Sequence, residues 1–160
     1  MKRNVKVLHF SVTDAGGAGK ACLRLHKGLS KEDSVDSKLL VLQKQSSQEE
    51  LECYEFYSSK LHYYLRTIIM SIFSKISRGL KFRKNKHSKF SSPISLHRLH
   101  NHDLFEWADV INLHWVGSSL DYRSFFKNVG KPVVWTLHDM HPFSGGNHYD
   151  FGFPKESFSK

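Results

Sequence analysis

Two short apolar runs near the carboxyl end of the sequence constrain its fold more than any other feature. Residues 110–113 and 133–137 are rich in β-branched side chains, and each run ends in a polar segment that contains a histidine. Runs of this kind are typical of strands buried on both faces of a parallel sheet. Ligands of open α/β sheets bind at the carboxyl ends of such strands. The two runs therefore predict an α/β fold with a candidate site at one sheet edge.

The amino-terminal part of the sequence predicts the first βα unit of the same fold. Residues 5–10 read as a buried strand, residues 11–18 as a loop, and residues 19–29 as a helix with one apolar face. Residues 37–43 predict a second strand, and the polar residues 44–55 predict a loop. Short connections between successive units imply right-handed crossovers. We expect a Rossmann-like parallel sheet with flanking helices.

The middle of the chain is helical in pattern and strongly basic. Apolar residues recur every three or four positions from residue 61 to residue 80, which predicts one long amphipathic helix. Shorter helices are expected at residues 101–107 and 121–128. The net charge of +9 comes from residues 56–102, which contain ten Lys or Arg and no Asp or Glu. The basic amphipathic helix and its loop span about residues 58–92.

This basic segment has two interpretations. It can lie on an anionic membrane surface, where each basic side chain contributes on the order of 1 kcal/mol. The alternative is an ordinary core helix followed by a solvated loop. Nucleic acid is not an expected partner, because no nucleic-acid motif accompanies the charge. The candidate membrane-binding residues are Arg78, Lys81, Arg83, Lys84, Lys86 and Lys89.

Length and composition place few further limits on function. A chain of 160 residues with 39% hydrophobic content fits one globular domain. Cys22 and Cys53 have no metal-ligand spacing, so we expect no metal site and a reducing, cytoplasmic environment. No export signal is visible, and no run of 18 apolar residues predicts a membrane span.

The glycine-rich loop after the first predicted strand is the first candidate site. Gly16, Gly17 and Gly19 precede a helix, whose amino terminus attracts anions. A Walker loop would need glycine where Asp14 stands, and a dinucleotide fingerprint would need a small residue where Cys22 stands. The loop therefore indicates substrate binding of another kind, or a tight turn without a ligand.

Histidines after the two carboxyl-terminal strands form the second candidate site. His138 can hydrogen-bond a sugar hydroxyl, and the adjacent Asp139 can fix its tautomer or accept a proton. His114 and Trp115 can add an aromatic platform for a sugar ring. The structural alternative for His138 is a histidine that caps the sheet edge. For His114 and Trp115 it is core packing under the loop. We expect His9 to lie inside the sheet. We expect His97, His100 and His102 to lie in solvent.

These motifs together resemble the amino-terminal domain of a family-4 glycosyltransferase of the GT-B type, in the branch that includes colanic-acid and other exopolysaccharide transferases. The resemblance rests on the Trp-Thr-Leu-His-Asp-Met-His-Pro-Phe-Ser-Gly-Gly segment and on the glycine loop. It implies retaining transfer of a sugar from a nucleotide-sugar donor to a saccharide or lipid-linked acceptor, without a metal or other cofactor. It also places the glycine loop in the interdomain cleft, His138 beside the donor sugar, and Gly145 and Gly146 in the binding region.

The same resemblance implies that part of the enzyme is supplied elsewhere. The family holds its donor mainly in a second domain, with two glutamates seven residues apart, and no two glutamates here have that spacing. We expect residues 1–160 to be one acceptor-side domain, incomplete as half of a GT-B fold and inactive alone. A separate donor-binding domain would then be a partner. The alternative is a non-catalytic module that binds a membrane, on its inner face, or another protein.

Overall fold

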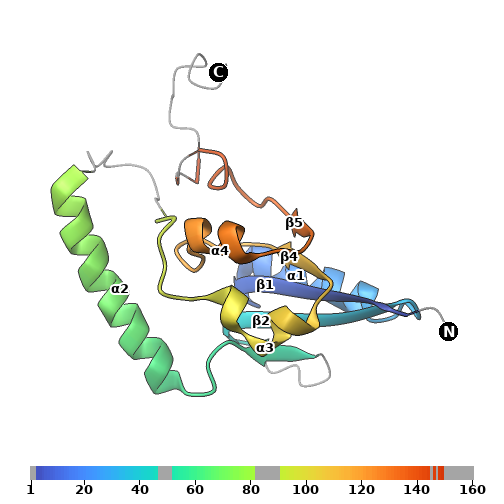
Figure 1. The fold of residues 1–160 in the computed structure, drawn as a ribbon. Helices are drawn as coiled ribbons and strands as arrows, with labels where there is room; N and C mark the ends of the chain where they lie inside the picture. Colours follow the sequence, from blue (N-terminus) through green and yellow to red (C-terminus); the bar gives the residue numbers. More distant parts are fainter. Residues whose placement is uncertain (1–2, 47–51, 82–90, 145, 147, 150–160) are drawn as a thin grey trace, which may run out of the picture.

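The computed structural model describes residues 3–46, 52–81, 91–144, 146, 148 and 149. It contains one five-stranded sheet with helices on both faces (Figure 1). Every strand pair is parallel, and the order across the sheet is β3-β2-β1-β4-β5. This arrangement confirms the predicted Rossmann-like α/β fold.

Four of the five strands lie where the sequence predicts them. They are β1 (Val5–Thr13), β2 (Val35–Gln43), β4 (Val110–Leu113) and β5 (Val133–Trp135). The fifth, β3 (Cys53–Glu55), lies within residues 44–55, where we expected only a loop. That expectation is wrong because a three-residue edge strand is too short to carry a recognisable pattern.

The helices also follow the predicted order. They are α1 (Gly16–Leu29), α2 (Lys60–Lys81), α3 (Asp103–Trp107) and α4 (Tyr122–Asn128), with a 3-10 turn at Leu99–Asn101. Helix α1 begins three residues earlier than predicted, so the glycines form its first turn. The side chain of Asp121 accepts a hydrogen bond from the Ser124 backbone N–H at 2.8 Å and caps α4.

The two faces of the sheet differ in chemistry. One face is apolar: Leu8, Phe10, Ile111 and Leu113 are fully buried, in the same cluster as Phe105 of α3 and Phe125 of α4. The other face lies under α1 and includes polar groups among its buried side chains. Because successive residues of a strand point to opposite faces, His9 and its paired neighbour Asn112 both belong to this second face.

Helix α2 does not bury its apolar face in the described structure. Leu61 is 66% exposed, and five further apolar side chains of its first four turns are about half exposed: Tyr64, Leu65, Ile68, Ile69 and Ile72. Figure 1 shows α2 standing to one side of the sheet. The core-helix interpretation is therefore wrong for residues 60–72. Within the described chain, no helix has the length and apolarity to cross a bilayer.

Candidate functional site

The candidate site lies where the strand order changes direction. The chain passes from β1 to β2 on one side and later returns to place β4 on the other side of β1. In open α/β sheets this switch point creates a crevice outside the carboxyl ends of the strands. The glycine turn follows β1, His114 follows β4, and His138 lies three residues beyond β5. The fold thus brings the predicted elements to the same edge.

The glycines of this edge have different structural roles. Gly16 has φ +70°, the left-handed region that glycine favours. A Cβ added to Gly19 would lie 2.5 Å from the Asp14 carbonyl carbon and 2.6 Å from the Thr13 oxygen, so Gly19 lets α1 approach the strand end closely. Gly17 is exposed and has open space around its Cα. Gly16 is likewise exposed with open space around its Cα, so Gly16 and Gly17 are the two positions with room for a ligand.

Asp14 holds the glycine turn against the neighbouring loop. Its carboxylate accepts backbone hydrogen bonds from Gln45 at 2.7 Å and Ser46 at 3.0 Å, and a further one from the Ser46 hydroxyl. Burial acts to raise the pKa of Asp14, but these hydrogen bonds outweigh it and hold that pKa below its usual value. Asp14 is therefore an ionised structural anchor between the ends of β1 and β2.

A chain of polar side chains leads from the sheet interior to His138. The Asn112 amide donates to the Val134 carbonyl at 3.1 Å and to the Thr136 hydroxyl at 3.0 Å. Its oxygen must then accept from the two imidazoles that face it, His9 Nδ1 at 2.8 Å and His114 Nε2 at 2.7 Å. Asn112 therefore fixes the tautomer of both histidines.

The fixed tautomer of His114 determines how it meets His138. Its remaining nitrogen, Nδ1, has a lone pair and lies 3.1 Å from His138 Nε2, which therefore donates. The two rings are stacked, with centroids 5.3 Å apart and an interplanar angle of 27°. Burial, together with the neighbouring His9 and His138, lowers the pKa of His114 to about 4, so His114 is neutral at pH 7. His138 is exposed and has Nδ1 available as an acceptor.

Asp139 organises the loop that follows β5. Its carboxylate accepts from Trp115 Nε1 at 3.2 Å and the His141 backbone N–H at 3.0 Å, and it pairs with His148 Nδ1. These contacts lower the pKa of Asp139 although burial opposes them. No hydrogen bond joins Asp139 to His138 among the described residues. Asp139 therefore links Trp115, after β4, to the loop that follows β5.

Ser91, His148 and Asp139 form a hydrogen-bonded series, with 2.7 Å between Ser91 Oγ and His148 Nε2. The series resembles a nucleophilic triad in connectivity. However, Ser91 and His148 are both more than nine-tenths buried, and a Cβ on Gly117 would lie 2.7 Å from Ser91 Oγ. A substrate has no room to reach the hydroxyl. The series therefore fastens Ser91 to the loop after β5.

The remaining predicted residues are only partly placed. Gly146 is buried with φ +111°, and its carbonyl accepts from the Ser91 N–H at 2.9 Å. Gly145 lies outside the described residues. Arg78 and Lys81 belong to α2. The other four predicted membrane-binding residues also lie outside the described part of the chain: Arg83, Lys84, Lys86 and Lys89.

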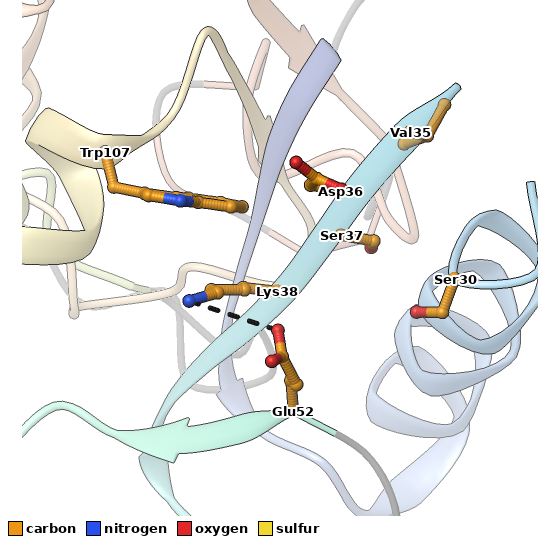
Figure 2. A pocket seen from close by; sticks show the side chains of 7 residues that line it. All are labelled: Ser30, Val35, Asp36, Ser37, Lys38, Glu52 and Trp107. Atoms are coloured by element: carbon orange, nitrogen blue, oxygen red, sulfur yellow. Dashed lines mark ion pairs between the residues drawn. The ribbon is translucent and has the colours of Figure 1, made fainter. Parts of the chain in front are cut away.

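A surface depression lies at the opposite end of the sheet and includes none of the predicted site residues. Figure 2 shows Asp36, Ser37 and Lys38 of β2 around it, with Trp107 at one side. Lys38 Nζ lies 4.0 Å from a Glu52 carboxylate oxygen and 4.7 Å from the Trp107 ring centroid. The charged groups of this depression are Asp36, Lys38 and Glu52, and none of them belongs to the predicted site.

Three polar residues that the sequence analysis did not select take part in this region: His9, His26 and Asn112. All three are buried on the α1 side of the sheet. The available signal was a polar residue inside an apolar strand, as in Val-Leu-His-Phe and Val-Ile-Asn-Leu. Such residues need buried partners, and therefore indicate a polar network.

We compared the chain with protein families, curated proteins and solved structures. No protein-family model matches the chain, and no curated protein or solved structure matches it either. The likeness to family-4 glycosyltransferases therefore stays a prediction from the sequence motifs.

Proposed function

We propose that this chain is the acceptor-side domain of a retaining glycosyltransferase that moves a sugar from a nucleotide-sugar donor to a saccharide or lipid-linked hydroxyl. The single observation that carries the proposal is the His114–His138 pair at the switch point, beside the glycine turn. Exposed imidazole and backbone N–H groups at such an edge are suited to bind hydroxyl and phosphate groups. The sequence resemblance supplies the reaction class.

In this proposal the chain's own residues orient the sugar. His138 donates Nε2–H to His114, which leaves Nδ1 to accept a hydrogen bond from a sugar hydroxyl. Asn112 keeps this orientation because its amide is held by the Val134 carbonyl. The open space at Gly17 admits the donor phosphate or the acceptor beside the first turn of α1. Asp139 positions Trp115 next to this edge.

The isolated chain should transfer no sugar, because a two-domain cleft must hold donor and acceptor together. In an assembly with a donor-binding domain, His138→Ala should lower kcat by roughly 10²-fold. The measurement is turnover of labelled sugar nucleotides. Robust transfer by residues 1–160 alone, or wild-type kcat in the His138→Ala assembly, would contradict the proposal.

We propose a second function, peripheral binding to an anionic membrane, because α2 leaves its apolar residues exposed next to the most basic part of the sequence. Apolar side chains of an interfacial helix enter the headgroup boundary, and basic residues attract anionic lipid. This binding would bring the candidate site to lipid-linked substrates at a cytoplasmic membrane surface.

Liposome co-sedimentation tests the membrane proposal. The chain should sediment with anionic vesicles at low salt and much less at high salt, since surface charge is screened. Two variants should weaken the binding: Ile68→Ser combined with Ile72→Ser, and the triple replacement of Arg83, Lys84 and Lys86 by Ser. Leu25→Ser is the matched control because Leu25 is an exposed apolar residue of α1. Equal binding to neutral vesicles, or no effect of either variant, would refute the proposal.

A further inference from the structure

His114 also belongs to a second group, formed by side chains of the types that bind metal ions. One ligand atom each from His9 of β1, Cys22 of α1 and His114 lie within 4.8 Å of one another. All three residues are buried. They come from three separate segments, so their sequence spacing does not reveal the group, and the expectation of no metal site rested on spacing alone.

Two buried imidazole nitrogens in this region have no hydrogen-bond partner among the described residues. They are His9 Nε2 and His26 Nε2, on rings whose centroids lie 5.9 Å apart. His26 lies one helical turn after Cys22, so both side chains are on the face of α1 that meets the sheet. A buried lone pair without a partner has a cost in free energy, which a ligand at this position would remove.

The Nδ1 atoms of the same two rings already have hydrogen-bond partners. His9 Nδ1 lies 2.8 Å from the Asn112 oxygen, and His26 Nδ1 lies 2.8 Å from the Ser37 hydroxyl. Metal-binding histidines are typically fixed in this way, with one nitrogen hydrogen-bonded and the other directed at the ion.

We propose that His9, Cys22 and His114 bind a Zn²⁺ ion. His26, whose ring centroid lies 5.9 Å from that of His9, is outside this group of ligand atoms and would have to move to complete a four-ligand set. Mixed imidazole and thiolate sets are characteristic of zinc. With Zn–N and Zn–S bonds of about 2.0–2.3 Å, the ligand atoms must draw together by roughly 1 Å. His114 binds through Nε2, which replaces its hydrogen bond to Asn112. The ring proton then lies on Nδ1 and donates to His138 Nε2, so the direction of the His114–His138 hydrogen bond reverses in the metal-bound form. The Cys22 thiol releases its proton to solvent as the Zn–S bond forms, which makes binding weaker in acid.

Metal content and cobalt spectroscopy test this site. The untagged chain is unfolded with a chelator, refolded with Zn²⁺ or Co²⁺ and desalted. We expect about one tightly held ion per chain and a thiolate-to-cobalt charge-transfer band in the near ultraviolet. Prolonged chelation of the zinc form should lower its Tm, because the ion binds only the folded state.

Two cysteine variants locate the ion. Cys22→Ala should abolish the charge-transfer band and most of the retained metal. Cys53→Ala is the matched control, because Cys53 packs near Cys22 but is not one of the grouped ligands, and it should keep both signals. Zinc that desalting removes from the wild-type chain, or a cobalt spectrum without a thiolate band, overturns the proposal even if Cys22→Ala does not fold. A thiolate band that survives in Cys22→Ala and vanishes in Cys53→Ala overturns it as well.

Discussion

His97 illustrates how tertiary contacts decide the state of a single histidine. We expected this residue in solvent, and the structure corrects that expectation, since only 6% of its surface is exposed. Its Nδ1 lies 2.6 Å from the Tyr57 hydroxyl, and the Phe56 ring and Arg66 of α2 lie close by. Burial, with a smaller effect of the Arg66 charge, lowers the pKa of His97 to about 4.

This lowered pKa predicts acid sensitivity. The unfolded chain binds a proton at His97 below pH 6.5, whereas the folded chain binds it only near pH 4. The contribution of a neutral His97 to stability is therefore present above pH 6.5 and is lost as the pH falls toward 4. His97→Gln, which keeps an acceptor for Tyr57, should lose less stability between pH 7 and pH 5 than wild type, by on the order of 1 kcal/mol. Urea denaturation at both pH values measures this, and parallel losses would contradict it.

At the residue scale the sequence predicts the ends of the polar network better than its centre. His114 and His138 follow apolar strands, so their place at the sheet edge can be inferred. Asn112 lies inside a strand, and its role depends on the register that pairs it with His9 on one side and Val134 on the other. No local pattern determines which strands become neighbours.

At the scale of elements, the turn from β1 into α1 combines a tightly packed glycine with an open one. A Cβ added to Gly19 would meet backbone atoms that cannot move aside, whereas a Cβ added to Gly17 would meet nothing within 4 Å. The sequence predicts the glycine turn but does not distinguish these two positions, since both precede or begin the helical pattern. Similarly, the periodicity of α2 predicts its length but not that its apolar face is exposed.

Matched alanine substitutions test this distinction. Gly19→Ala should destabilise the fold by about 1–3 kcal/mol, because its Cβ overlaps the backbone of residues 13 and 14. Gly17→Ala should be neutral or stabilising by up to about 1 kcal/mol, because alanine favours helix. Chemical denaturation gives both values. Equal stability of the two variants would show that α1 does not approach β1 as closely as described.

At the scale of the whole molecule, the sequence predicts the fold class and the sheet edge at which the candidate residues meet. It predicts neither β3 nor the polar layer under α1, since both arise from contacts between distant segments. The strand order places β1 at the switch point and so unites the glycine turn with the histidine pair. The central claim is that this edge recognises sugars.

Histidine side-chain NMR during titration with a panel of neutral and acidic oligosaccharides tests that claim most directly. We predict saturable shifts of the His114 and His138 ring signals for at least one saccharide, lost in His138→Ala. Lys38→Ala, at the far end of the sheet, should leave the shifts unchanged. Absence of any shift across the panel, or shifts that persist in His138→Ala and vanish in Lys38→Ala, would contradict the claim.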